Sequence, residues 1–567
     1  MKERRVKGWW LNKLALIIVG RKGIGDLRRS SRNGKKSLEK TLRRILSLAK
    51  DTVYGKEHNY SEILKAKTPE ELFDLYQKNV PINDYEDLRS YVDRHKNGES
   101  DILIPGRPKM YSTTSGTTKE PKWIPVSDMY YKQVYRTMNQ IWFYAMMKNR
   151  PRVFYGHSLS IVGKAIEGEA PDGTMCGSIS GVIQRDVPFF MKKTYSTPHE
   201  TFYISEYRSR YYGLIRMGLE HRDISIIVTA NPSTLVAMQD NINENFETYC
   251  DDIEHGTVSD KFEVADDIRE VLKKHLKPNP ERAAELRKLK AQYGTVLPKH
   301  YWPNLQIVTC WFSGNTKIYF DRVRDCYPSQ CFFHEFGYIS TECKAGVVLK
   351  SNCRDTVIFG HKNYVEFIHE TDIDNPNPKI YQAYEAEEGK RYILLVTTCS
   401  GLYRYNTNDL VKITGFYNQF PCIEFIQKVN GTVSLTGEKL HEQQFIEAVR
   451  ETEKKTGKIA PFFVGFADPE KSRYKFYFEF ADQAISVTEA EEFTKYLDSC
   501  LQDYNSEYRD KRTSNRLKEP ETALLLPHAF ERFKEICVNQ GFRDAQFKIN
   551  NLMQDEKRHA MFKELVK

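Results

Sequence analysis

Apolar residues near the start of the chain follow a helical spacing. Within residues 36–78, Leu38, Leu42, Ile45 and Leu48 recur every three or four positions. Residues spaced in this way lie on one face of a helix. We therefore predict that this segment is helical, with an apolar face turned towards a core.

The next part of the chain combines strand-like and helix-like patterns. A β-branched run at 226–230, IIVTA, is followed by an amphipathic stretch from Leu235 that predicts one helix. Residues 261–292 are highly charged and predict helix with a break at 277–281, KPNPE. A strand, a loop and a helix in this order are typical of α/β folds.

The same rhythm continues beyond residue 305. The apolar stretch LQIVTCWF precedes a charged, helix-like segment at 320–327, and a second apolar stretch, CFFHEFGY, ends in a polar turn. Long apolar runs of this kind suit strands that are buried on both faces. The fold class that we predict is α/β.

The last third of the chain predicts further strands and then a small separate unit. Residues 392–416 predict two strands joined by a Ser-Gly turn, and Asn430-Gly431 is a hairpin signal. Beyond a boundary placed at Gln427 and Lys428, the pattern predicts a compact α+β unit with a helical tail. Its elements are predicted as a helix at 441–455, strands at 461–467 and 473–481, and a helix at 487–502.

The length of the chain requires more than one domain. At 567 residues it exceeds what a single hydrophobic core holds. We predict a basic N-terminal arm at 1–35, a large domain at 36–427 and a small domain at 428–567.

Positive charge is concentrated at the N-terminus. Residues 1–44 contain 15 Lys and Arg against 3 Asp and Glu, a net charge of +12, which leaves −3 for the rest of the chain. Together with Trp9 and Trp10, such an arm could lie weakly on an anionic membrane surface. More often such a segment is a helix docked on its own domain with a solvated basic face, and we favour that alternative. No nucleic-acid-binding motif accompanies the charge, so no nucleic-acid partner is expected.

Cysteines and hydropathy favour a cytoplasmic protein. The 11 cysteines are an odd number without a C-x-x-C pair, which argues against a disulfide framework and a structural zinc site. The apolar run at 14–19 is too short to span a bilayer, so no stable membrane insertion is expected.

The segment 112–122, STTSGTTKEPK, is the first stretch that suggests chemistry. Backbone N–H groups at a tight turn around Gly116 and the ammonium of Lys122 can point at the same anionic oxygens. Hydroxyls that can join them belong to Thr114, Ser115, Thr117 and Thr118. The composition fits a phosphate-binding loop, and it also fits an ordinary polar surface turn.

Two later polar turns each deliver an acidic residue. YISTE at 338–342 places Glu342 after a strand, and YRYNTND at 403–409 places Asp409 near another. Taken alone, Glu342 also fits an acid at a helix N-terminus, and Asp409 also fits a simple turn aspartate.

In this order and at these separations, the three turns resemble those of the adenylate-forming superfamily of acyl-CoA synthetases, adenylation domains and luciferase. The chain resembles more closely the Gretchen Hagen family of acyl-acid amido synthetases, the auxin-responsive enzymes of plants and their bacterial relatives. Supporting blocks are GSISGVIQ (177–184), DDIEHGT (251–257), YWPNLQIV (301–308), GLYRYNTND (401–409) and LTGEKLHE (435–442). The resemblance implies a large domain of mixed βα sheets with a barrel-like subdomain, and a small, mobile α+β domain.

The resemblance also implies a two-step reaction that uses ATP and Mg²⁺. A small carboxylic acid attacks the α-phosphate of ATP to give acyl-AMP and pyrophosphate, and an amine, often that of an amino acid, then displaces AMP. Two alternatives are an acyl-adenylating ligase with a thiol acceptor, such as coenzyme A or a carrier protein, and a protein of this fold that binds nucleotide or acyl ligand without turnover.

Roles for individual residues follow from the same resemblance. Glu342 matches an acid that helps to hold Mg²⁺, Tyr338 an aromatic residue beside adenine, and Asp409 the acid that binds the ribose hydroxyls. Lys548 in AQFKINN matches a catalytic lysine that reaches the α-phosphate and the substrate carboxylate. The loop residues expected to cradle the β- and γ-phosphates are Thr114, Ser115, Gly116, Thr117, Thr118 and Lys122; Lys439 and Lys428 are expected near the nucleotide, Lys428 also near the hinge.

Several positions depart from the family pattern. Lys119 and Asn408 stand where the family has glycine, and asparagine tolerates the left-handed backbone region better than lysine does. Gln427-Lys428 replaces Gly-Arg at the hinge, and Ile549-Asn550 replaces the Pro-Arg after the catalytic lysine.

The acyl pocket is expected between GSISGVIQ and the TANPS turn. Ser180, Ile183 and Asn231 are candidates for its lining. The apolar character of these segments suggests an aromatic or medium aliphatic acid.

Overall fold

A computed structural model of the chain describes residues 6, 9–114, 122–162, 165–187, 192–204, 206–230, 232–312, 320, 323–373, 375–429, 432–530, 532–533, 536, 551–554 and 556–567. The described residues form two compact units, one that extends to residue 427 and one that begins at Lys428. The division into arm, large domain and small domain stays a prediction. No described helix is both long and apolar enough to cross a bilayer.

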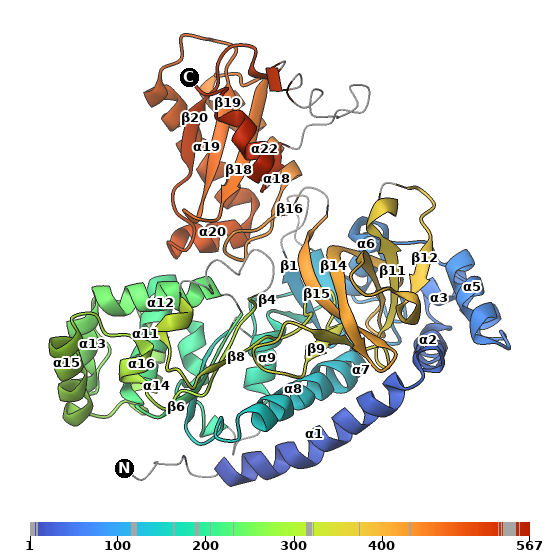
Figure 1. The fold of residues 1–567 in the computed structure, drawn as a ribbon, viewed down its shortest axis with the longest axis horizontal. Helices are drawn as coiled ribbons and strands as arrows, with labels where there is room; N and C mark the ends of the chain where they lie inside the picture. The colour runs from blue at the N-terminus through green and yellow to red at the C-terminus, as the bar shows by residue number, and fades with distance from the viewer. Residues whose placement is uncertain are drawn as a thin grey trace. The chain divides into compact units, whose positions relative to one another are not determined.

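Helices make up the N-terminal part of the first unit (Figure 1). The predicted helix at 36–78 is confirmed in type, but it is divided. Thr52 and Thr68 begin two of the pieces by capping a backbone N–H with their hydroxyls. The helices are α1 (Trp9–Ser31), α2 (Gly34–Ala49), α3 (Val53–Glu57), α4 (Tyr60–Ile63), α5 (Pro69–Asn79) and α6 (Tyr85–Lys96).

The arm predicted at the N-terminus contains the long helix α1, which lies along helix α8 (Arg136–Asn149) (Figure 1). Two glycines of α1 make this contact close. A β-carbon at Gly23 would lie 2.7 Å from a side-chain atom of Ile141, and one at Gly20 would overlap Tyr144. Helix α1 is therefore docked on its own unit, which is one of the two alternatives given for the arm.

A four-stranded parallel sheet confirms the βα rhythm of the middle of the chain. Its order is β3-β6-β7-β8, from β3 (His157–Ile161), β6 (Ile224–Thr229), β7 (Ile307–Thr309) and β8 (Phe332–His334). The connecting helices are α9 (Ile179–Arg185), α11 (Tyr207–Glu220), α12 (Pro232–Glu244), α13 (Phe246–His255), α14 (Asp266–Lys273), α15 (Pro280–Tyr293) and α16 (Pro298–Tyr301), with a 3-10 turn at His199–Tyr203.

One detail of this region differs from the predictions. The single helix expected after β6 is two helices, since Asn245 separates α12 from α13. Asparagine competes with helical hydrogen bonds through its own amide, which makes it a common boundary residue. In the helix-like segment at 320–327, Phe320 and Val323 are helical, and the 3-10 turn Arg324–Cys326 follows them.

A largely antiparallel sheet of seven strands occupies the place of the predicted barrel-like subdomain. Its order is β12-β11-β13-β14-β15-β10-β9, from β9 (Gly346–Val348), β10 (Thr356–Ile358), β11 (Tyr364–His369), β12 (Ile380–Gln382), β13 (Arg391–Thr397), β14 (Tyr405–Tyr417) and β15 (Phe420–Lys428). A smaller sheet, β2-β1-β5-β4, contains β1 (Met110–Thr114), β2 (Lys122–Val126), β4 (Gly168–Glu169) and β5 (Met175–Cys176). Between β2 and α8 lie α7 (Asp128–Tyr130) and a π-helical turn (Tyr131–Tyr135).

The second unit is an α+β domain built on the sheet β20-β19-β18-β21. The predicted helix–strand–strand–helix order is confirmed by α18 (Glu442–Thr456), β18 (Phe462–Asp468), β19 (Arg473–Glu479) and α19 (Val487–Tyr504). The helical tail was wrong in part: α20 (Ser506–Thr513) and α22 (Glu556–Phe562) are helices, but β20 (Glu521–Leu524) and β21 (Leu552–Met553) are strands. The strand β20 pairs with β19, and β21 pairs with β18, and this pairing decides the conformation of β20 and β21. Such long-range contacts leave no local pattern in the sequence. The short ladder β16 (Thr432–Val433) and β17 (Leu440–His441) precedes α18.

Candidate active site

The strands β1 and β2 flank the predicted phosphate loop. They pair antiparallel from Met110 opposite Val126 to Thr114 opposite Lys122, so the two ends of the loop are held next to each other. The ammonium of Lys122 lies 5.7 Å from the ring centroid of Tyr85 on α6. The loop itself, with Ser115, Gly116, Thr117, Thr118 and Lys119, lies outside the described residues.

A buried hydrogen bond joins two of the predicted nucleotide ligands. The hydroxyl of Tyr338, in the segment between β8 and β9, donates to Oδ2 of Asp409 in β14. Both residues are buried, at 6% and 4% exposure. Burial, and next the charge of Asp409, raise the pKa of Tyr338 well above its usual value, so the phenol keeps its proton and remains the donor.

Asp409 lies at a bulge, where the pairing of β13 with β14 is irregular. Ile393 pairs with Leu410 and Leu395 pairs with Asn406, so residues 407–409 lie opposite one residue of the neighbouring strand. Within this bulge Asn408 has a φ of 54°, and its N–H donates to Oδ1 of Asn406 at 2.9 Å. Asparagine tolerates this left-handed conformation. The departure from glycine at Asn408 is therefore compatible with the backbone that presents Asp409.

Glu342 lies at the end of a tight turn in the same segment as Tyr338. The N–H of Ser340 donates to the carbonyl of Cys343 at 2.8 Å, and Ile339 and Lys344 form an isolated β-bridge. Glu342 is 8% exposed.

Tyr405 lies close to both predicted acids. Burial raises the pKa of this phenol most, and the charges of Glu342 and, more weakly, Asp409 raise it further. The hydrogen bond brings Tyr338 and Asp409 together across 71 positions, and the charge of Glu342 reaches the neighbouring Tyr405.

Lys344 supports the Glu342 turn, although no motif in the sequence marked it. Its side chain is 4% exposed and its ammonium donates to Oδ1 of Asn139 on α8. Its N–H donates to the hydroxyl of Tyr130 at 2.9 Å, and its carbonyl accepts from Nδ2 of Asn363 at 2.7 Å. Burial lowers the pKa of Lys344 to about 7.

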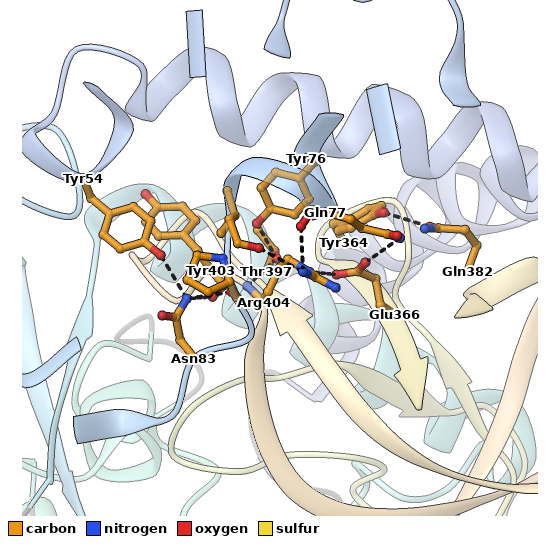
Figure 2. A network of polar contacts seen from close by, with 12 residues as sticks. Tyr54, Tyr76, Gln77, Asn83, Tyr364, Glu366, Gln382, Thr397, Tyr403 and Arg404 are labelled. Atoms are coloured by element: carbon orange, nitrogen blue, oxygen red, sulfur yellow. Dashed lines mark hydrogen bonds and ion pairs between the residues drawn. The ribbon is translucent and has the colours of Figure 1, made fainter. Parts of the chain in front are cut away.

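A buried ion pair lies directly before the Asp409 segment (Figure 2). Nε of Arg404 donates to Oε2 of Glu366 in β11 at 3.0 Å, and the two side chains are 5% and 1% exposed. Arg404 also donates from Nη1 to the carbonyl of Val80 at 2.9 Å. Its φ of 43° is unusual for a residue with a long side chain, and the backbone N–H is held by Oγ1 of Thr397 at 2.9 Å.

Asn83, in the segment between α5 and α6, continues this network (Figure 2). Its N–H donates to the carbonyl of Arg404 at 3.1 Å, and its carbonyl accepts from the N–H of Asn406 at 2.8 Å. Its amide group donates to the carbonyl of Tyr403 at 2.7 Å and to the hydroxyl of Tyr54 at 2.9 Å. The backbone on both sides of Arg404 is thus fixed just ahead of Asp409. Arg404 lay within the quoted motif YRYNTND, but nothing in the sequence linked it to Glu366 or Asn83.

The acyl-pocket candidates are described only in part. Ser180 and Ile183 lie on α9; Ser180 is exposed and within 2.7 Å of the Ser178 hydroxyl, whereas Ile183 is half-buried against the main core of the first unit. Asn231 lies outside the described residues. Val228, at the end of β6, packs against the same core as Ile183.

The predicted lysines beyond the boundary belong to the second unit. Lys428 is the last residue of β15. Lys439 is held by its backbone, because its N–H donates to Oε2 of Glu507 at 3.0 Å and its carbonyl accepts from Nδ2 of Asn505 at 2.8 Å. Lys548 lies outside the described residues.

Two other features of the first unit are formed by different residues. A cavity of about 990 Å³ is bordered by Phe312, Tyr327 and Arg354, and none of the predicted site residues that the structure describes lines it. At the start of β3 and β6, His157, His221 and Asp223 have ligand-type atoms within 4.8 Å of one another. Nδ1 of His157 lies 2.9 Å from Oδ1 of Asp223. This contact joins the start of β3 to the residue just before β6. Two imidazoles suit zinc-like ions and not Mg²⁺.

Comparisons with known proteins cover almost the whole chain. Models of three domains match in order: the GH3 family N-terminal domain at residues 23–332, the central domain at 356–428 and the C-terminal domain at 443–557. Indole-3-acetic acid-amido synthetase GH3.3 of Arabidopsis thaliana is 23% identical over 558 residues, with 93% of this chain and 91% of that protein covered. Jasmonoyl-L-amino acid synthetase GH3.5 of Oryza sativa subsp. japonica is 25% identical, with 93% of each covered.

Among solved structures, the chain is similar to the GH3.15 acyl acid amido synthetase. The TM-score is 0.64 with 22% identity, and 96% of each chain is covered. This likeness shows the fold.

Proposed function

Because this chain belongs to the GH3 family, we propose that it is an acyl-acid amido synthetase, a ligase that activates a carboxylic acid with ATP and joins it to an amine, an amino acid in the first instance. The observation that carries the proposal is the match of all three family domains, in order, between residues 23 and 557. Two relatives matched over more than nine-tenths of their length are named as an indole-3-acetic acid-amido synthetase and a jasmonoyl-L-amino acid synthetase.

Activation is needed because a carboxylate is a poor electrophile. Attack of its oxygen on the α-phosphate of ATP forms an acyl–phosphate bond and releases pyrophosphate, after which AMP serves as the leaving group for the amine. The first step joins two anions, so positive charge and N–H dipoles must already be in place.

We assign the ribose hydroxyls to Asp409 and the adenine ring to Tyr338. A carboxylate accepts two hydrogen bonds, which suits two neighbouring hydroxyls. The Tyr338 hydroxyl holds one oxygen of Asp409. The bulge at Asn408 and the buried Arg404 pair support this arrangement by fixing the backbone around Asp409.

Mg²⁺ is the expected metal, and Glu342 is our candidate ligand. A carboxylate oxygen at a turn fits the preference of this hard cation for oxygen. When bound, Mg²⁺ would neutralise charge on the phosphate oxygens. The charges of Glu342 and Asp409 both act on Tyr405, which supports one common site for the metal and the ribose.

We assign the phosphates to Thr114, Ser115, Gly116, Thr117, Thr118 and Lys122. Pairing of β1 with β2 supports this role, because it keeps both ends of the loop together. We further propose that Lys548 stabilises the charge that develops at the α-phosphate, that Lys428 lies at the hinge of a mobile small domain, and that Lys439 lies near the nucleotide.

The identity of the acid is proposed only as a class. An aromatic or medium aliphatic acid fits Ile183 and the apolar residues around it, with Ser180 and Asn231 as further candidate lining residues. The relatives are named for indole-3-acetic and jasmonic acids, and a solved relative was crystallised with 2,4-DB. We expect a cytoplasmic location, where ATP is abundant; no disulfide joins the described cysteines.

Pyrophosphate exchange into ATP across a panel of carboxylic acids tests the proposal. Acid-dependent exchange is expected, followed by amide formation when amino acids are added. Exchange with thioester products and no amide would favour a thiol acceptor. ATP binding without exchange for any acid would favour a protein of this fold that does not turn over.

A further inference from the structure

Helix α1 has one face that is fixed against its own unit. Leu16 and Leu27 are buried, and Gly20 and Gly23 allow α8 to approach closely. The end of the helix is tied down as well, because the carbonyl of Ser31 accepts from the N–H of Gln419 at 2.8 Å. The opposite face is therefore held outward.

The N-terminal half of the outward face is apolar. Trp10, Leu11, Leu14 and Ile18 are exposed by 55%, 40%, 50% and 64%. Residues 10, 14 and 18 follow a spacing of four, so they share one side of the helix. These four make up a substantial share of the large apolar side chains that are exposed in the described part of the chain, and they lie within nine positions. A helix that is apolar on both sides needs a second apolar or interfacial environment.

The C-terminal half of the same face is basic. Arg21 and Lys22 follow Trp10 and Leu11 by eleven residues, and Arg28 and Arg29 follow them by eighteen, which is about three and about five helical turns. All four basic side chains are exposed, and Arg29 also pairs with Asp26. The outward face of this 23-residue helix thus changes from apolar to cationic over a length of about 34 Å.

We propose that the outward face of α1 binds a membrane surface that contains acidic phospholipids. Trp10, Leu11, Leu14 and Ile18 enter the boundary between headgroups and acyl chains, and Arg21, Lys22, Arg28 and Arg29 contact lipid phosphates. Charge complementarity identifies this occupant, because residues 1–44 carry +12 whereas the rest of the chain carries −3.

Two other occupants fit the face less well. A second copy of α1 would place basic residues against basic residues in a parallel pair, and against apolar residues in an antiparallel pair. A nucleic acid would satisfy the basic half only.

Vesicle sedimentation with the full chain tests the proposal. We expect binding to phosphatidylcholine vesicles that contain phosphatidylglycerol, and much weaker binding to vesicles of phosphatidylcholine alone. Raising the salt from about 0.1 M to about 1 M shortens the screening length from about 10 Å to about 3 Å and should release most of the protein. Equal binding to both kinds of vesicle, or binding to neither, would overturn the proposal.

Point variants locate the contact. L14S/I18S should weaken partitioning about tenfold or more, because two apolar side chains leave the interface. R28Q/R29Q should reduce the preference for acidic lipid. The matched control is I459S/V487S, which alters side chains in the second unit that are 50% and 62% exposed, and it should bind as the wild type does. Unchanged binding of L14S/I18S would refute the assignment, as would a concentration-dependent dimer that L14S/I18S abolishes, since that face would then belong to a second copy. Thermal unfolding of each variant checks that it is folded.

Discussion

The guanidinium of Arg404 and the carboxylate of Glu366 form a 3.0 Å ion pair that is almost completely removed from solvent. The pair joins β11 to the segment that leads into Asp409, and Arg404 also binds the carbonyl of Val80. Removing one partner leaves the other charge buried without compensation.

Glu366→Gln should therefore lower the free energy of unfolding by about 3 kcal/mol, within the range typical of broken buried pairs. Urea denaturation measures the change. The control is Glu424→Gln, which breaks the half-exposed pair with Arg354 and should cost less than about 1 kcal/mol. Equal effects of the two substitutions would argue against the importance of burial at Arg404.

Asp409→Asn should weaken the use of ATP if Asp409 binds the ribose. Loss of a hydrogen bond to a charged group corresponds to a fall in kcat/KM for ATP of about tenfold or more. Tyr338→Phe keeps the ring and removes only the hydroxyl that holds Asp409, so a smaller loss is expected. The exposed Asp51→Asn serves as control. Wild-type kinetics for Asp409→Asn would remove this residue from the site.

Asn408→Gly should be tolerated, because φ at this position is 54° and glycine adopts this conformation without strain. Asn408→Val should lower stability by about 1–2 kcal/mol, since a β-branched side chain is unfavourable in the left-handed region. Thermal unfolding and pyrophosphate exchange report the two effects. If valine were as stable as asparagine, the bulge before Asp409 would differ from the one described.

Lys548→Ala should abolish pyrophosphate exchange and leave ATP binding nearly unchanged, because the proposed contact forms during adenylation. Equilibrium dialysis measures binding, and radiolabelled pyrophosphate measures exchange. Lys563→Ala, at an exposed position of the same unit, should behave as the wild type. Loss of both binding and exchange in Lys548→Ala would indicate a role in holding the nucleotide.

The buried His334 predicts a pH dependence of stability. Burial lowers the pKa of His334 from 6.5 to about 3. Between these two pKa values, the imidazole of His334 binds a proton in the unfolded chain but not in the folded chain. The free energy of unfolding should therefore decrease as the pH falls below 6.5.

Urea denaturation at about pH 7.5 and about pH 5 measures this decrease. His334→Asn can keep a polar contact to Ser351 but cannot titrate, so its stability should depend less on pH. His255→Asn, at an exposed helix end, is the control. An unchanged pH dependence in His334→Asn would contradict the prediction.

Local patterns were sufficient for much of the fold. The spacing of Leu38, Leu42 and Ile45 predicted α2 because each residue reaches the same core from successive turns. The β-branched run at 226–230 predicted β6 within about a residue or two. The polar turns at 338–342 and 403–409 stood out because they interrupt apolar strands, and a hydrogen bond from Tyr338 to Asp409 joins them.

Contacts between distant segments were beyond the sequence. The Arg404–Glu366 pair joins residues 38 positions apart, and Asn83 binds the backbone at Tyr403 across 320 positions. No spacing rule connects such residues. For the same reason β20 was mistaken for helix, since its partner β19 decides its conformation.

The close packing of Gly20 and Gly23 on Tyr144 and Ile141 bears on how the protein should be produced. A shortened form that starts at residue 36, where the sequence suggests that a domain begins, would uncover the apolar side of α8. Such a form should aggregate or express poorly although every residue assigned to chemistry is retained. The N-terminal helix α1 therefore covers an apolar surface of the first unit and is part of its folded structure.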